Sequence, residues 1–254
     1  MPTPGYPSLV DPWVPAGGFL DDGVRATSPR PVGRTLLCVS DVHGDRHALE
    51  AVLDAARHLR LEGIVAAGDH CLGGPDPFGV WQRLVQLGAT MVRGASDLAL
   101  GTVGAGEVRP KSAREEARLL TFLRTQEALG EIVCRKLAEL PVTAVVSLED
   151  TSGVMVMHGS PNDDLRGLLD DEHLADEVAC VAEDVLVVGA THRGFERRLA
   201  KLLVINAGSV GTSPTRVRDT RTAHAVLIQP FDDGVVRAFA HDVPVPAAAA
   251  RRAV

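Results

Sequence analysis

The sequence predicts an α/β fold with two layers of β-strands and helices outside them. Short apolar runs alternate with amphipathic helical patterns between residues 35 and 92, which is typical of strand–helix–strand units. From residue 143 onward strand patterns dominate, which indicates a second sheet built from hairpins. A chain of 254 residues with 45% hydrophobic residues is long enough for one sizeable core and at most two small domains.

In the first part of the chain, strands and helices are expected in alternation. Residues 35–40 form an apolar run that ends at an acidic cluster, which predicts a buried strand. Apolar residues recur at helical spacing over 49–59 and again over 78–87, which predicts two amphipathic helices. Shorter apolar runs at 63–67 and 89–92 predict the second and third strands.

Residues 98–140 interrupt this alternation. Glycines over 98–106 predict a loop. Helical patterns follow over 112–129 and 131–140, and Gly130 separates them. We expect this segment to form a helical insertion over the edge of the sheet.

The second half of the chain is rich in strand patterns, and a single clear helical pattern over 172–182 interrupts them. Turn residues separate the apolar runs, so hairpins are expected. The expected strands lie at 143–148, 153–157, 185–188, 202–205 and 223–229, with 235–240 as a further candidate.

The two ends of the chain differ from the body. Residues 1–33 hold seven prolines and five glycines, which disfavour helix and strand, yet Tyr6, Trp13 and Phe19 lie among them. We therefore expect an irregular arm that partly docks on the body. Residues 34–242 are expected to form a single domain, and the Pro- and Ala-rich residues 243–254 a flexible tail.

The composition argues against several classes of function. The net charge is −7 and no block of Lys and Arg stands out, so bulk nucleic-acid binding is not expected. No apolar run approaches the roughly 18–20 residues of a membrane helix, and no signal peptide is visible. The four cysteines, Cys38, Cys71, Cys134 and Cys180, form no CxxC pair. This usage fits a reducing compartment, and we expect a cytoplasmic protein without membrane attachment.

Residues of metal-ligand type follow four of the expected strands. An Asp-x-His spacing places both side chains on the same side of an extended segment, so one ion can take both. Carboxylate and imidazole ligands without thiolate suit Mn, Fe, Co or Zn. A single histidine at a strand end is more often an ordinary polar residue, but four such clusters together favour a metal site. The clusters contain Asp41 and His43, then Asp69 and His70, then His158, then His192.

The order and spacing of these motifs resemble the calcineurin-like metallophosphoesterases. The strings DVHGD, AAGDHCLGGPDP, VRGASD, VMHGSP, GATH and INAGSVG carry the resemblance over about residues 34–230. The small bacterial phosphodiesterase-type members are the most similar. The resemblance implies a four-layer αββα sandwich, here with a helical insertion at about 107–140. It also implies hydrolysis of phosphate esters at a centre of two metal ions.

The resemblance implies that the first metal site is complete. Asp41, His43, Asp69 and His192 match the family's ligands to that ion. Asp69 also matches the carboxylate that bridges both ions, and His158 matches a ligand of the second ion, so both are expected to take part in catalysis. Mn is the preferred metal, with Fe, Zn, Co or Ni as alternatives.

The second metal site departs from the family pattern. Ala95 and Ala190 stand where the family has an Asn and a His ligand, and Ser96 stands where it has its general-acid His. Disturbing an outer-shell partner alone lowers metal affinity by about 10–100-fold, so losing two direct ligands predicts a second site that is weak or absent. Losing a general acid slows hydrolysis by about 10²–10⁴. His70 and Asp97 are candidates to compensate, unless His70 faces the opposite layer and Asp97 caps the next turn.

Several further residues have two interpretations. The loop 206–209 either presents N–H groups to an anion or is a plain turn, and Arg93 either meets a phosphate or forms a structural ion pair. The Gly- and Pro-rich residues 73–77 are interpreted as architecture. The remaining histidines, expected on the surface or behind the ligands, are His47, His58, His173, His224 and His241.

The leading hypothesis is a metal-dependent phosphoesterase of phosphodiesterase or phosphatase type that uses metal-bound water. Its activity is expected to be reduced or specialised, and its substrates to be small phosphate esters or nucleotides. The alternative is a catalytically degenerate family member that binds phosphate or nucleotides or acts as a regulatory interaction module. The oligomeric state does not follow from the sequence.

Overall fold

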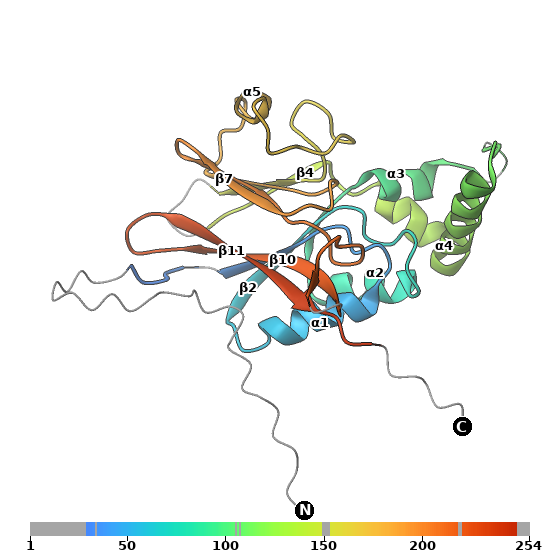
Figure 1. The fold of residues 1–254 in the computed structure, drawn as a ribbon, viewed down its shortest axis with the longest axis horizontal. Coiled ribbons are helices and arrows are strands. Elements are labelled where there is room, and N and C mark those ends of the chain that lie inside the picture. Colours follow the sequence, from blue (N-terminus) through green and yellow to red (C-terminus); the bar gives the residue numbers. More distant parts are fainter. Residues whose placement is uncertain are drawn as a thin grey trace, which may run out of the picture.

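The computed structural model describes residues 29–247, except 34, 105, 107, 149–152, 218 and 219. The three aromatic residues of the expected arm and most of the expected tail lie outside this range. Two β-sheets face each other in the described part of the chain, with helices around them (Figure 1). The predicted α/β fold with a two-layer β core is confirmed.

The first sheet combines parallel and antiparallel strands. Strands β1, β2 and β3 are parallel, and β10 adds to β1 in the antiparallel sense. Because parallel strands end at the same edge of a sheet, the segments after β1, β2 and β3 meet there. The order is β11–β10–β1–β2–β3, with β9 on β10; the bounds are β1 Thr35–Val39, β2 Leu61–Ala67, β3 Thr90–Val92, β9 Arg216–Val217, β10 Thr220–Pro230 and β11 Val236–Pro244.

The second sheet has a parallel centre and a hairpin at each edge. Strands β5, β6 and β8 are parallel, whereas β4 pairs with β5 and β7 pairs with β8 in the antiparallel sense. The prediction of hairpins therefore holds for the two edges. The order is β4–β5–β6–β8–β7, and the bounds are β4 Thr143–Val146, β5 Val154–Met157, β6 Val185–Val188, β7 Phe195–Leu199 and β8 Leu202–Asn206.

The central core lies between the two sheets. Leu36 and Val65 of the first sheet pack there with Val156, Val187 and Ile205 of the second. Burial of these side chains is the main driving force that holds the sheets together. It also fixes the edge of one sheet over the edge of the other, where the polar segments meet.

Two helices cover the outer face of the first sheet (Figure 1). Helix α1, Arg46–Ala56, begins after Asp45, whose side chain accepts a hydrogen bond from the Ala48 N–H. Helix α2, Pro77–Gln86, begins after Asp76, which accepts in the same way from the Gly79 N–H. Such caps satisfy donors that the first helical turn leaves free.

Helices α3, Ala95–Thr102, and α4, Ala113–Ala138, pack on each other beyond the strand ends (Figure 1). The prediction of a loop over 98–106 is therefore wrong for residues 98–102. The misleading residue was Gly101, because a Cβ atom there would lie 2.5 Å from the Cys134 carbonyl oxygen, so the glycine permits close helix packing. Gly130 interrupts α4 with φ 72° and ψ 161°, as its separating role predicted. None of the helices in the described ranges combines the length and apolar character that crossing a membrane requires.

Three other expectations need correction. The hairpin β10–β11 joins the first sheet, not the second, because β10 pairs with β1. The helix expected over 172–182 is a single turn, α5, Leu174–Glu177, which is enough to bury Leu174 and bring Val178 against the second sheet. Strand β7 was not expected, since its charged, exposed residues carry no apolar alternation and it is held by backbone pairing with β8.

Candidate metal centre

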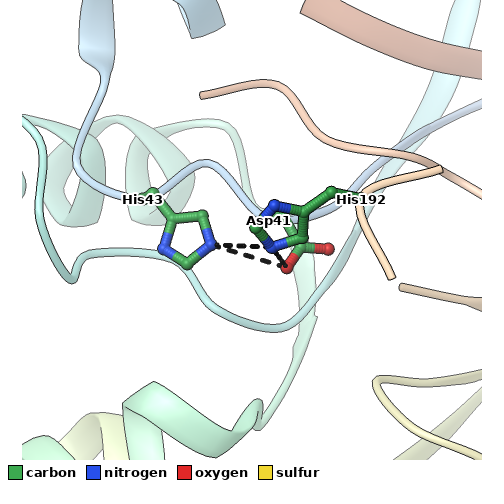
Figure 2. A group of neighbouring side chains, drawn as sticks. All are labelled: Asp41, His43 and His192. Atoms are coloured by element: carbon green, nitrogen blue, oxygen red, sulfur yellow. Dashed lines mark hydrogen bonds and ion pairs between the residues drawn. The ribbon is translucent and has the colours of Figure 1, made fainter. Parts of the chain in front are cut away.

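Five side chains that the sequence singled out lie together where the two sheets meet. Their ligand atoms form two groups, each with all atoms within 4.8 Å of one another. The first ligand group is Asp41, His43 and His192, and the second ligand group is Asp41, Asp69 and His158. Figure 2 shows the two imidazole rings of the first ligand group beside the Asp41 carboxylate. Asp69 falls in the second ligand group, with its Oδ2 4.0 Å from His43 Nε2.

The backbone around these ligands is strained. A left-handed conformation is uncommon for residues other than glycine and costs about 1–3 kcal/mol where the surroundings impose it. The described residues contain six such positions, and all except Ala200 belong to or adjoin the ligand groups. The five are Asp41 with φ 51°, His43 with 49°, Asp69 with 54°, Ala190 with 67° and His192 with 59°.

The two oxygens of the buried Asp41 carboxylate have different surroundings. Oδ2 accepts hydrogen bonds from the Ser40 hydroxyl at 2.6 Å and from the Ala190 N–H at 3.1 Å. Oδ1 lies 3.0 Å from His192 Nε2 and 3.6 Å from His43 Nε2 but receives no hydrogen bond. A buried carboxylate oxygen without a donor is costly, so a positive species is expected to complete it.

Two histidine rings are oriented by backbone carbonyls. Nδ1 of His43 lies 3.0 Å from the Leu72 oxygen, and Nδ1 of His158 lies 2.7 Å from the Ala67 oxygen. Because a carbonyl only accepts, Nδ1 carries the proton in both rings. Each Nε2 then presents a lone pair toward the carboxylates, which is how histidine binds metal ions.

A chain of hydroxyl groups orients His192. The Ser209 hydroxyl donates to the Asp41 carbonyl at 2.8 Å, so its proton is used. Thr212 Oγ1, 3.0 Å from Ser209 Oγ, must then be the donor in that pair. Its oxygen is therefore the acceptor for His192 Nδ1 at 2.8 Å. His192, like His43, is left with a lone pair on Nε2.

These orientations bring three acceptors together without a proton between them. His43 Nε2 and His192 Nε2 lie 3.2 Å apart, and both face Asp41 Oδ1. Ligands held about 2.1 Å from one ion lie about 3.0–3.4 Å apart at usual coordination angles. The first ligand group therefore fits a divalent cation.

The pKa values of Asp41 and His43 are shifted in the directions expected for a cation-binding site. Burial acts to raise the pKa of Asp41, but His192, His43 and His158 together with the Ser40 hydroxyl outweigh it and hold that pKa well below its ordinary value. Burial acts to lower the pKa of His43, yet the nearby negative carboxylates of Asp41 and Asp69 raise it. When no cation is bound, the two carboxylates therefore favour protonation of His43, and a divalent cation would compete with that proton for Nε2.

Asp69 connects the two ligand groups to helix α3. Its Oδ1 accepts a hydrogen bond from the Ser96 N–H at 2.8 Å and lies 3.5 Å from His158 Nε2. The positive end of a helix stabilises a carboxylate in this position. Asp97 supports the arrangement, because its carboxylate accepts from the N–H groups of Asp69, Gly94 and His70 at 2.8, 2.9 and 3.1 Å.

The residues named as compensating ligands lie outside both ligand groups. The Asp97 carboxylate is occupied by the three N–H groups, and the ring of His70 is buried with Nε2 3.0 Å from the Val92 carbonyl oxygen. At the altered positions, Ala95 and Ala190 have only methyl groups to offer. The hydroxyl of Ser96 is buried and has no hydrogen-bond partner among the described residues.

Two glycines make room for the ligands. Gly68 has φ 90°, and a Cβ atom there would lie 2.5 Å from His158 Nδ1. A Cβ atom at Gly189 would lie 2.0 Å from the Ser40 hydroxyl and 2.8 Å from Asp41 Oδ2. No other residue fits either position without moving a ligand.

The structure also decides between the two interpretations of Arg93 and of the loop 206–209. Arg93 lies 3.5 Å from Asp164 Oδ2 and donates to the Ala138 carbonyl, which is a structural role. Asn206 binds the Gly189 carbonyl and the Gly208 N–H, so its side chain stabilises the turn. Sequence reasoning missed the roles of the Ser40, Ser209 and Thr212 hydroxyls. Ser209 lies in the loop 206–209 that the sequence had singled out, and Thr212 directly follows the INAGSVG string.

The other histidines lie outside both ligand groups. His47 bonds the Pro246 carbonyl at 2.8 Å, and His173 is exposed. His224 bonds Asp242 at 2.9 Å and packs against Gly194 and Gly208.

Comparison with known proteins agrees with this geometry. Residues 35–229 match the family model described as the calcineurin-like phosphoesterase superfamily domain. The chain belongs to this superfamily. Its members depend on divalent metal ions and act on small phosphoesters or nucleotides. The chain has no match among functionally curated proteins.

Solved structures share the fold. A metallophosphoesterase from Sphaerobacter thermophilus is 23% identical with a TM-score of 0.65, over 84% of this chain and 89% of that one. A hypothetical protein from Pyrococcus horikoshii is 19% identical with a TM-score of 0.70, over 84% and 88%. A putative diadenosine tetraphosphatase is 20% identical with a TM-score of 0.52, over 82% and 94%. The predicted metallophosphoesterase sandwich is thus confirmed.

Proposed function

We propose that this chain hydrolyses small phosphate esters with a divalent cation held by Asp41, His43 and His192, and that a second cation binds weakly or not at all. The observation that carries the proposal is the unpartnered, buried Asp41 Oδ1 facing two imidazole lone pairs. Mn is the preferred ion, with Fe, Zn, Co and Ni as alternatives, since these metals accept carboxylate and imidazole ligands.

The second ligand group supports the view that the second cation is weak. Asp69 and His158 remain beside Asp41, but Ala95 and Ala190 provide no side-chain donor. His158 Nε2 then has two uses. As a lone pair it helps to hold a loosely bound cation, and when protonated it donates a hydrogen bond to a phosphate oxygen.

The chain constrains which esters react. A bound divalent cation supplies Lewis acidity toward a phosphoryl oxygen and acidifies water. In the hydrolysis, the oxygen of water forms a bond to phosphorus, and the bond to the leaving oxygen breaks with its electron pair on that oxygen. The proton of water passes to solvent. Ser96 offers no imidazole to protonate the leaving oxygen, so leaving groups that are stable as anions should react best.

The direct test is hydrolysis of bis(p-nitrophenyl) phosphate with added Mn²⁺. Asp41→Ala should reduce the rate by more than about 100-fold, because it removes the ligand shared by both groups. His173→Ala, at an exposed position, is the matched control and should keep the wild-type rate. Equal rates for wild type and Asp41→Ala would overturn the enzyme proposal. Elemental analysis should give one ion per chain, and two would contradict the weak second site.

A second candidate function is a phosphate- or nucleotide-binding or regulatory module without catalysis. The altered residues Ala95, Ser96 and Ala190 favour it, because three functional side chains of the family pattern are missing together. Under this alternative, inorganic phosphate binds to the Mn²⁺-loaded chain and Asp41→Ala abolishes that binding. No ester is then hydrolysed above the level of the variant.

A further inference from the structure

A groove of about 900 Å³ lies between helices α3 and α4. Its walls include the apolar residues Leu72, Ala99, Val103 and Phe122. Pockets that bind small organic molecules usually measure about 300–1,000 Å³ and are mostly apolar with a few polar groups. The groove has the size and the character of such a pocket.

The groove adjoins the metal centre through two elements. The carbonyl of Leu72 holds the His43 ring, while Leu72 also lines the groove. Ser96 lies in the first turn of helix α3 and its N–H donates to Asp69, while Ala99, about one turn later, lines the groove. One loop and one helix therefore contribute residues to both sites, which places the groove next to the metal centre.

The groove carries positive charge that the protein leaves unused. Arg114 and Arg118 lie one helical turn apart on α4, and both line the groove. Neither guanidinium has a carboxylate within 4.0 Å in the part of the chain that the structure describes. The neighbouring Glu115 accepts a hydrogen bond from the Lys111 N–H at the helix start. Unpaired arginines beside apolar walls suit an anionic ligand with a large apolar part.

We infer that the substrates are phosphate esters with a bulky aromatic group, and that this group occupies the groove between α3 and α4. The inference rests on the proposed function and specifies its substrate class. The aromatic group packs against Ala99 and Phe122, and the positive charges of Arg114 and Arg118 attract the anionic ester to the groove. An aromatic alcohol also leaves readily as an anion, which agrees with the missing acid at Ser96.

The binding experiment uses 1-naphthyl phosphate as the probe and methyl phosphate as its small counterpart. Calorimetry on the Mn²⁺-loaded and the metal-free protein should show naphthyl phosphate binding at least tenfold more tightly than methyl phosphate. Ala117→Trp fills the groove from its exposed wall and should remove this advantage. Ala113→Trp, exposed on the same helix outside the groove, is the matched control and should keep it.

The kinetic experiment compares naphthyl p-nitrophenyl phosphate with methyl p-nitrophenyl phosphate, which share one leaving group. Wild type should show a KM at least tenfold lower for the naphthyl ester, and Ala117→Trp should bring the two KM values together.

Equal KM values in wild type, with Mn²⁺-dependent turnover intact, would overturn the groove assignment and leave the proposed function standing. Naphthyl phosphate binding that depends on Ala117 without turnover of any ester would support the groove and refute the proposed function. A wild-type dimer that Ala117→Trp converts to monomer would also overturn the assignment, since a second copy would then cover the groove.

Discussion

The first and second ligand groups share Asp41 but differ in what surrounds their other members. In the first, the rings of His43 and His192 are each fixed through Nδ1 and bring Nε2 to Asp41 Oδ1. In the second, Asp69 and His158 remain, but Ala95 and Ala190 adjoin them without donor side chains. Under the proposed function, the first ligand group holds a cation with oriented side chains, and the second ligand group lacks two of the ligands that a second cation would need.

The altered half nevertheless keeps its backbone functions. The Ala190 N–H donates to Asp41 Oδ2, and the Ser96 N–H donates to Asp69 Oδ1. A side-chain substitution leaves such N–H groups in place, so Asp41 and Asp69 stay oriented whatever side chains stand at positions 95, 96 and 190. Orientation of the two carboxylates therefore does not depend on the side chains that the proposed second site lacks.

The largest effect is expected from restoring the family's side chains around the second ligand group. The triple variant Ala95→Asn, Ser96→His and Ala190→His supplies two ligands and an acid, and should raise the rate of hydrolysis by about 10²–10⁴. The left-handed φ of 67° at Ala190 does not prevent this, since His192 adopts φ 59° nearby. Steady-state kinetics on an alkyl phosphodiester and metal analysis check the result, with two ions per chain expected.

The single variant Ser96→His is the control for this experiment. It supplies the acid alone, so it should accelerate esters with poor leaving groups while the metal content stays at one ion. A triple variant with unchanged rate and unchanged metal content would show that the backbone of the altered half no longer suits a second site.

The next largest effect is expected from removing the hydroxyl group that orients His192 in the first ligand group. Thr212→Val removes the acceptor of His192 Nδ1 and should lower Mn²⁺ affinity by about 10–100-fold, as loss of an outer-shell partner does. Thr212→Ser keeps the hydroxyl and should restore the affinity. Titration calorimetry with Mn²⁺ measures both. If valine and serine behave alike, the hydroxyl chain from Asp41 to His192 has no role in binding.

Thr212 also shows where sequence reasoning ends. Asp41, His43, Asp69, His158 and His192 stand at strand ends, so their types and places in the chain were enough to predict that they would meet. The partners of their Nδ1 atoms are carbonyls of residues 67 and 72 and one hydroxyl, and no residue type marks a carbonyl in advance. The meeting of the candidate ligands was therefore predictable, and the groups that orient their rings were not.

The fold shows the same division. Buried strands such as β1 and β6 were predicted because continuous apolar runs record their burial. Strand β7 and helix α3 were missed, since the first is held by backbone pairing and the second contains a glycine that serves close packing. Pairing of β10 with β1 depends on contacts between distant segments, which periodicity does not report.

A smaller effect is expected from substituting Gly68, because this change should disturb the second ligand group and spare the first. Gly68→Ala should destabilise the chain by about 1–3 kcal/mol, because the φ of 90° is strained for alanine and the Cβ atom would meet the His158 ring. It should also disturb the second ligand group and leave Mn²⁺ binding by the first largely intact. Gly88→Ala is the matched control, with φ 61° and nothing within 4 Å of the added atom. Denaturant unfolding should show the larger loss for Gly68→Ala, and equal losses would mean that the His158 contact is relieved.

The smallest expected effect is a change in how the stability of the protein depends on pH, and it arises from His43 of the first ligand group. The pKa of His43 is raised above its ordinary value of about 6.5, since the nearby negative carboxylates of Asp41 and Asp69 outweigh burial. A raised pKa in the folded state stabilises the metal-free protein fully below pH 6.5, and this stabilisation is lost as the pH rises through the folded-state value. Mn²⁺ competes with the same proton, so its stabilising effect should grow over that window. Thermal unfolding in EDTA and in Mn²⁺ should therefore show opposite pH trends for wild type relative to His43→Gln, and parallel trends would mean that His43 does not hold the ion.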